Sequence, residues 1–190
     1  MSHYELETSG WVLVRCLKVL ELVDICSDVF KLEAMMPPFL GFSVVTPAPI
    51  EMKSGRLIDY RLRLHGIPIR WRTRITDRWR TRITDWKPPS RFVDSQMRGP
   101  YSMWVHTHTF DEIDGGTLMR DVVRYSAIGG ALVHRLFVKR DLQRIFEYRQ
   151  KILPALLGIE SSDCRFESID IRRAVNDSCE GAEQTASTSE

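Results

Sequence analysis

One pattern constrains the fold of this chain most strongly: a long region in which apolar and polar residues alternate, followed by one long amphipathic segment. Apolar residues alternate with charged ones over residues 57–65, and the two-residue period continues over residues 67–75. Because successive side chains of a strand point to opposite faces, this period predicts strands with one apolar and one charged face. Such strands form antiparallel sheets with one face against the core and the other in water.

Turn signals divide the chain into several predicted strands. Gly66 and Pro68, the Arg98-Gly99-Pro100 segment and the Asp114-Gly115-Gly116 segment are typical of chain reversals. The predicted strands span residues 4–14, 42–46, 57–65, 67–75, 91–97, 101–110 and 117–125. We therefore expect a curved antiparallel sheet of six to seven strands.

Two other regions have helical spacing. Apolar residues at helical steps over residues 17–35 predict one or two short helices, which Pro37 and Pro38 end. Residues 132–157 carry this spacing over a longer stretch, with Lys, Arg, Asp and Glu on the other face and Gly158 at its end. The predicted fold class is α+β, with the sheet wrapped around this long C-terminal helix.

The length of the chain, 190 residues, is enough for one domain with a core. We place this domain at residues 1–158. Residues 159–190 are expected to be a largely disordered tail, because the end of the chain is rich in Ser, Thr and Glu.

Composition limits the partners of the chain. A net charge of +2 predicts no basic face for nucleic acid. The four cysteines are scattered, so their spacing predicts neither a zinc knuckle nor a redox motif. No apolar run approaches the roughly 20 residues that cross a bilayer, and the N-terminal residues lack the pattern of a signal peptide. We therefore expect a soluble, cytoplasmic protein without membrane insertion.

The octapeptide RWRTRITD occurs twice in succession, at residues 70–77 and 78–85. A period of eight residues is too short for a solenoid, so we interpret the repeat as a local tandem duplication. Because eight is even, both copies present the same faces and compete for one place in the sheet. We expect one copy to pair and the other to extend the hairpin or bulge outwards, which lowers stability. The repeated arginines are interpreted as a solvated outer strand face rather than a nucleic-acid site.

Three longer strings resemble one known superfamily. They are MMPPFLGFSVVTPAPIEMKSGRLIDYRLRLHGIPIRWRTRI at residues 35–75, WKPPSRFVDSQMRGPYSMWVHTHTF at residues 86–110 and GGTLMRDVVRY at residues 115–125. Together they resemble the ligand-binding SRPBCC proteins of the START-like superfamily, in particular a bacterial, cyclase/dehydrase-like branch. The resemblance covers residues 4–156, and the chain departs from it at the second octapeptide and over residues 14–30. It implies a helix-grip fold whose deep cavity, between the sheet and the C-terminal helix, binds a lipid, a polyketide or another hydrophobic molecule.

The candidate chemistry lies on two neighbouring strands. A turn at residues 114–116 would place His106 near Asp121, His108 near Met119 and Phe110 near Thr117. Arginines occupy the outer face of the second strand, so the histidines and Asp121 are predicted to point inwards. The preceding strand adds two further candidates, Asp94 and Gln96.

Aromatic side chains provide the predicted lining of the cavity, where core and cavity wall are the same surface. With the polar cluster they make up the candidate ligand-binding residues: Tyr60, Trp71, Gln96, Trp104, His106, His108, Phe110, Asp121 and Tyr125.

The pairing of His106 with Asp121 has three interpretations. It is a satisfied polar network that orients a ligand, which we favour because buried polar groups need partners. It is alternatively an acid/base pair, in which Asp121 raises the basicity of His106. The third alternative is a metal site formed by His106, His108 and Asp121, which we do not adopt because the sequence offers no fourth ligand. We expect no cofactor and no metal.

The sequence favours a protein that binds a small hydrophobic molecule. Two alternatives remain open. The first is a cyclase or dehydratase-type enzyme that uses His106 and Asp121 as catalytic residues, although no motif of a known catalytic class occurs. The second is a protein-interaction module without enzymatic activity, in which the groove binds a partner peptide or a sheet edge forms a homodimer.

Overall fold

The computed structural model describes residues 2–13, 22, 26–78, 91–113 and 115–174. Over these residues the chain forms one nine-stranded sheet, one long helix and several short helical segments. The strands are β1 (Tyr4–Leu13), β2 (Ser43–Val44), β3 (Leu57–Leu64), β4 (Ile67–Arg78), β5 (Arg91–Arg98), β6 (Tyr101–Ile113), β7 (Gly116–Ala127), β8 (Cys164–Phe166) and β9 (Asp170–Arg173). The helices are α2 (Val29–Ala34), α3 (Gly130–Val133) and α4 (Lys139–Leu157), with the short turns η1 (Pro38–Leu40), η2 (His134–Val138) and η3 (Ser161–Asp163).

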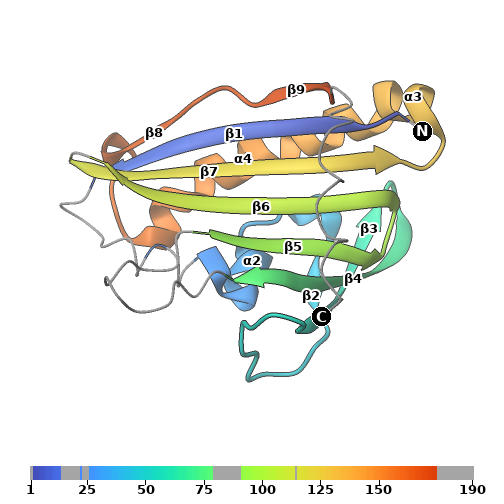
Figure 1. Cartoon of the computed structure of the whole chain (residues 1–190), viewed down its shortest axis with the longest axis horizontal. Coiled ribbons are helices and arrows are strands. Elements are labelled where there is room, and N and C mark those ends of the chain that lie inside the picture. Colours follow the sequence, from blue (N-terminus) through green and yellow to red (C-terminus); the bar gives the residue numbers. More distant parts are fainter. Residues whose placement is uncertain (1, 14–21, 23–25, 79–90, 114, 175–190) are drawn as a thin grey trace, which may run out of the picture.

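The sheet is antiparallel, with the strand order β2-β3-β4-β5-β6-β7-β1-β8, and β9 also pairs with β1. Figure 1 shows the sheet in front of α4, which runs behind β7 and β1. The predicted α+β class, with a curved antiparallel sheet around a long C-terminal helix, is confirmed. The sheet is larger than expected, because the described residues form nine strands rather than six or seven.

The helical run at the C-terminal end begins at Gly130 and ends at Leu157, with a π-helical turn at η2 between α3 and α4. The side chains of Leu142, Phe146 and Leu153 are buried at helical steps along α4, which explains how this helix packs on the sheet. Gly158 ends the helix with a φ of 69°, a conformation that a glycine adopts without strain.

The expected boundary after residue 158 does not match the structure. Beyond α4 the chain forms β8 and β9, and both pair with β1 at the edge of the sheet. These strands are only three and four residues long, so their alternation is too short to be recognised in the sequence. The folded part therefore continues to residue 174, and residues 175–190 lie outside the described residues.

The first copy of the octapeptide lies within β4. Its residues pair with β3 on one side and β5 on the other. The predicted competition between the two copies falls on residues 79–90, which lie outside the described residues.

The hairpin of β6 and β7 has a different register from the predicted one. Ile113 pairs with Gly116, and consequently Phe110 pairs with Met119 and His108 with Asp121. The sequence prediction had paired Phe110 with Thr117, and it was wrong by two residues because it assumed a longer turn. A shift of two residues keeps every side chain on its predicted face.

The core lies between the sheet and α4. Leu6, Val123 and Tyr125 of the sheet pack with Leu142 and Phe146 of the helix, and all five are almost fully buried. Among the helices that the structure describes, none is long and apolar enough to cross a membrane.

Candidate functional site

Two adjoining cavities lie between the sheet and α4. The first has a volume of about 150 Å³ and the second about 420 Å³. Their walls are mostly apolar, and they share six lining residues: Met36, Phe42, Trp71, Trp104, Phe146 and Arg149. The two cavities are therefore neighbouring parts of one interior space.

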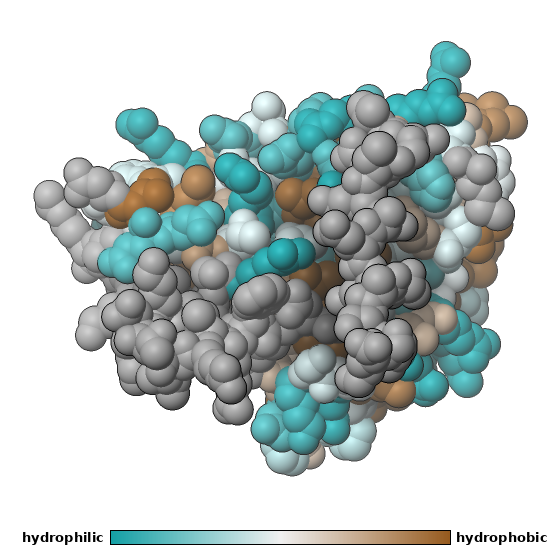
Figure 2. Space-filling view, in the orientation of Figure 1, coloured by the Kyte–Doolittle hydropathy of each residue, from teal (hydrophilic) through white to brown (hydrophobic). Residues whose placement is uncertain are grey.

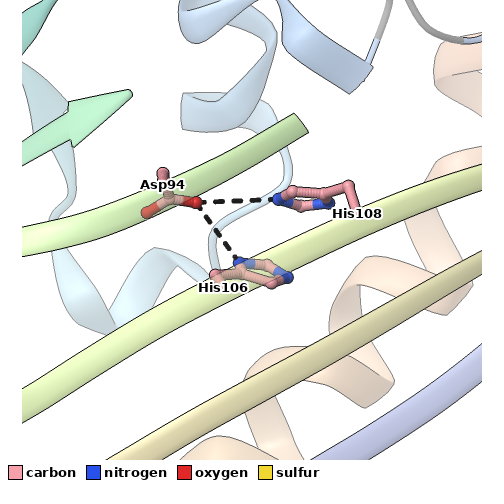
Figure 3. Close-up of side chains that lie close together, drawn as sticks. All are labelled: Asp94, His106 and His108. Carbon is pink, nitrogen blue, oxygen red and sulfur yellow. Dashed lines mark ion pairs between the residues drawn. The ribbon is translucent and has the colours of Figure 1, made fainter. Parts of the chain in front are cut away.

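The first cavity has a group of four ionisable side chains in its wall, Asp94, His106, His108 and Asp121, which we call the His–Asp cluster. Asp121 Oδ1 lies 2.5 Å from His108 Nδ1 and 3.2 Å from His106 Nε2. On the opposite side, Asp94 Oδ2 lies 3.7 Å from His106 Nδ1 and 3.7 Å from His108 Nε2. Figure 3 shows Asp94 of β5 facing both imidazoles of β6. Each imidazole is thus placed between two carboxylates.

Strand pairing builds this cluster. His106 and His108 are two residues apart on β6, so both point to the same face of the sheet. Asp94 of β5 is the direct cross-strand partner of His106, and Asp121 of β7 is the direct partner of His108. The four side chains therefore meet because of the registers of β5, β6 and β7, and no loop is needed to position them.

The two histidines differ in their affinity for a proton. Burial and the nearby His108 lower the pKa of His106, against the attraction of Asp121 and Asp94. Burial also acts against the charged form of His108, but the attraction of Asp121, its hydrogen bond with His108 and the attraction of Asp94 outweigh it and raise the pKa of His108. Although burial acts in the other direction, both histidines hold the pKa of Asp121 well below its ordinary value. In the metal-free cluster His108 therefore holds a proton more tightly than His106 does.

Arg149 of α4 is a functional candidate that the sequence prediction missed. Its side chain lines both cavities, although we had placed the charged residues of this helix on the outer face. Its Nε is buried without a hydrogen-bond partner, and burial lowers the pKa of the guanidinium. The helical spacing indicates the inner face of α4 for Arg149, because this residue is three residues after Phe146 and four before Leu153. A cation therefore lines the interior space on the side of the helix, together with the His–Asp cluster of the sheet.

The remaining candidates fall into two groups. Tyr60, Trp71 and Trp104 line the cavities, with Trp71 and Trp104 in an edge-to-face contact at 5.2 Å. The other three candidates do not appear among the residues that line the two cavities: Gln96, Phe110 and Tyr125.

These three side chains have structural contacts instead. The Gln96 amide donates to the Tyr101 carbonyl at 2.7 Å and thereby holds the turn between β5 and β6. Phe110 packs in the core, and the Tyr125 hydroxyl is hydrogen-bonded to His134. Phe110 and Tyr125 do point inwards, as the alternation of their strands predicts. The alternation alone, however, does not distinguish the wall of a cavity from the packed core.

The second cavity lies near the end of the molecule where α3 and η2 meet the β3–β4 turn. Ile67, Ile128 and Phe137 line it, and all three are largely exposed. Figure 2 shows hydrophobic surface at this end of the molecule, near the position of α3 in Figure 1. An apolar molecule can therefore approach the interior over an apolar rim.

Comparison with solved structures identifies the fold. The TTHA0849 protein from Thermus thermophilus superimposes with a TM-score of 0.56 at 17% identity, covering 81% of this chain and 97% of that one. The Zhui aromatase/cyclase from a Streptomyces species gives a TM-score of 0.52 at 14% identity, covering 82% and 92%. Ara h 8.0201 gives a TM-score of 0.53 at 14% identity, covering 82% and 99%.

These likenesses show a helix-grip fold, the fold that the resemblance of the sequence strings implies. They extend over nearly the whole length of the solved proteins, so the likeness is one of complete domains. No protein-family model matches the sequence, and no curated protein matches it either.

Proposed function

We propose that this helix-grip chain binds a small, largely apolar molecule that carries one anionic or strongly polar group. The observation that carries the proposal is the pair of adjoining cavities between the sheet and α4, whose mostly apolar walls include the His–Asp cluster and Arg149. Ligand pockets of this kind combine an apolar lining with a few polar groups that fix orientation. The fold supports this function, since solved proteins with this fold include an aromatase/cyclase.

Arg149 supports the anionic group. Arg149 is half-buried, and its buried Nε has no hydrogen-bond partner, which is unfavourable unless a ligand supplies an acceptor. Arg149 lines both cavities. A ligand whose carboxylate or enolate oxygen lies near Arg149 therefore has room for its apolar body in the larger, second cavity. The neighbouring aromatic rings of Trp71 and Trp104 then contact the apolar body.

The experiment is extraction of the purified full chain with organic solvent, followed by mass spectrometry, and competition of the extract against an apolar fluorescent probe. We expect a stoichiometric apolar acid in the extract. Ile69→Trp fills the second cavity, where Ile69 is half-buried, and should abolish probe binding. Leu118→Trp is the matched control, because Leu118 is half-buried outside both cavities. Probe binding that survives in Ile69→Trp contradicts the proposal.

A second candidate function is a cyclase or dehydratase reaction on the bound molecule. The observation that favours it is the contact of the buried His106 imidazole with Asp121, and burial lowers the pKa of His106 and so favours the neutral form that accepts a proton. Asp121 holds this imidazole by Nε2 at 3.2 Å. Turnover that is lost in His106→Gln while probe binding persists supports this function, and equal loss of both does not.

The remaining expectations stay predictions. These are a cytoplasmic location, the absence of nucleic-acid partners, and the alternative of a homodimeric interaction module. A stable dimer that binds no small molecule would favour the last.

A further inference from the structure

Three acceptor atoms of the His–Asp cluster converge on one point. Asp94 Oδ2 is equally distant, at 3.7 Å, from His106 Nδ1 and from His108 Nε2. Both distances exceed the length of a hydrogen bond. One ligand atom from each of the three residues lies within 4.8 Å of the other two. Two metal–ligand bonds of about 2 Å each span up to about 4 Å, so the separations from Asp94 match those across a metal ion.

Asp121 determines which nitrogens face this point. An ionised carboxylate only accepts hydrogen bonds, so His106 Nε2 and His108 Nδ1 donate to Asp121 Oδ1. In a neutral imidazole the other nitrogen then carries the lone pair. Those other nitrogens are the two that face Asp94 (Figure 3). In known metal sites a carboxylate likewise accepts a hydrogen bond from the histidine nitrogen that does not bind the metal.

The charges of the cavity also favour a cation at this point. With neutral imidazoles, Asp94 and Asp121 contribute two negative charges, and the nearby Arg149 contributes one positive charge. An uncompensated negative charge is unfavourable in a buried space. A divalent cation reverses the balance and leaves one positive charge, which suits a single anionic oxygen from the cavity.

We propose that Asp94, His106 and His108 bind one divalent first-row transition-metal ion, and that Asp121 is a positioning residue for the two imidazoles. Two nitrogens and one carboxylate oxygen suit Zn²⁺ and its first-row neighbours, whereas Ca²⁺ and Mg²⁺ prefer oxygen ligands alone. Three protein ligands leave a coordination position open towards the cavity. The structure thus replaces Asp121, which we had considered as a ligand from the sequence, with Asp94. The proposal goes beyond apolar-ligand binding and does not depend on it.

The test is a Zn²⁺ titration of the full chain, stripped of metal and extracted free of lipid, followed by calorimetry. We expect one bound Zn²⁺ per chain. Asp94→Asn and the double variant His106→Gln/His108→Gln should weaken binding by more than 100-fold. Asp121→Asn keeps all three ligands and should weaken binding by about 10–100-fold, the usual effect of losing a carboxylate behind a ligating histidine.

Two matched variants exclude other binding groups. His65→Gln removes an exposed histidine that also pairs with an aspartate, Asp141, and should leave Zn²⁺ binding unchanged. Cys26→Ser removes a thiol that lines the same cavity and should also leave it unchanged. Far-UV circular dichroism establishes that each variant is folded.

A readout on the unmodified chain keeps the test valid if a variant fails to fold. Nitrogen NMR of the imidazoles should show Zn²⁺ on Nδ1 of His106 and on Nε2 of His108. The proposal is overturned if no stoichiometric Zn²⁺ binds, if binding persists in the double variant, or if Cys26→Ser abolishes it. Loss of apolar-ligand binding with intact Zn²⁺ binding would overturn only the proposed function.

Discussion

The Tyr125 hydroxyl and the Nε2 atom of His134 form a buried hydrogen bond of 2.9 Å. This bond joins β7 to the start of the C-terminal helical run. Tyr4 of β1 stacks on the same imidazole with the ring centroids 3.5 Å apart. β1, β7 and the C-terminal helical run therefore meet at His134, at the end of the molecule where α3 lies.

Replacing Tyr125 by phenylalanine tests this junction. Tyr125→Phe leaves the buried His134 Nε2 without its partner and should lower the free energy of unfolding by about 1–3 kcal/mol. Urea denaturation measures the loss. Tyr148→Phe on α4 is the control, because Tyr148 is only half-buried, and should change stability little. Since Tyr125 is not among the residues that line the two cavities, binding of an apolar probe should be unchanged. If a stably folded Tyr125→Phe variant binds the probe more weakly, Tyr125 belongs to the binding site.

Arg149 should select for an anionic ligand. Arg149→Met keeps an unbranched side chain but removes the charge, and should reduce affinity for a fatty acid by roughly 10–100-fold, the value of one charge-assisted hydrogen bond. Affinity for the matching fatty alcohol should change little. Fluorescence displacement measures both ligands. Arg144→Met, on the exposed side of the same helix, should alter neither. Equal losses for acid and alcohol would mean that Arg149 acts through packing alone.

Deleting one octapeptide should stabilise the protein. Either deletion, 70–77 or 78–85, gives the same product because the copies are identical. The connection between β4 and β5 spans residues 79–90 and becomes eight residues shorter. A shorter loop loses less entropy on closure, so the free energy of unfolding should rise by about 1 kcal/mol. Thermal and urea denaturation measure the change. A less stable product would show that the second copy makes contacts of its own.

The two histidines of the cluster should titrate on opposite sides of the ordinary histidine pKa in the metal-free chain. His108 faces Asp94, Asp121 and His106, and its pKa is raised, whereas the pKa of His106 is lowered. The stability from His108 is fully present below about pH 6.5. It is lost as the pH rises through the folded-state pKa. His106 acts in the opposite sense, because its lowered pKa makes protonation favour the unfolded chain as the pH falls.

NMR titration of the imidazoles measures both values. Asp121→Asn removes the negative charge next to His108 and should lower the pKa of His108 towards its ordinary value. If His108 titrates unchanged in this variant, Asp121 does not form an ion pair with it.

The sequence predicted the faces of the strands more reliably than their registers. Alternation is a property of each strand, so the inward direction of His106, His108 and Asp121 followed from the residues alone. The pairing of His108 with Asp121 depends on a turn in which Ile113 pairs with Gly116, and the Asp114-Gly115-Gly116 signal is compatible with more than one turn length. For this reason the prediction assigned Asp121 to His106 alone, whereas its carboxylate contacts both histidines.

The sequence prediction was wrong for residues whose placement depends on tertiary packing. Arg149 was assigned to solvent because charged residues are rarely buried, although its spacing from Phe146 placed it on the inner face. Gln96 was assigned to the cavity from strand parity, but its amide is satisfied by the backbone of Tyr101 at the nearby turn. The strands β8 and β9 were missed because three or four residues carry too little pattern, and their stability comes from pairing with β1.

The registers of β5, β6 and β7 have a consequence for how this site evolves. Every member of the His–Asp cluster lies at a strand position whose side chain points into the cavity. The chemistry therefore depends on the alternation of side chains along each strand. An insertion or deletion of one residue within β6 turns both imidazoles out of the cavity, whereas a change of two residues keeps them inside but moves them away from their cross-strand partners Asp94 and Asp121. Lineages that retain the cluster should accordingly keep the lengths of these strands, while the connections between the strands vary freely in length.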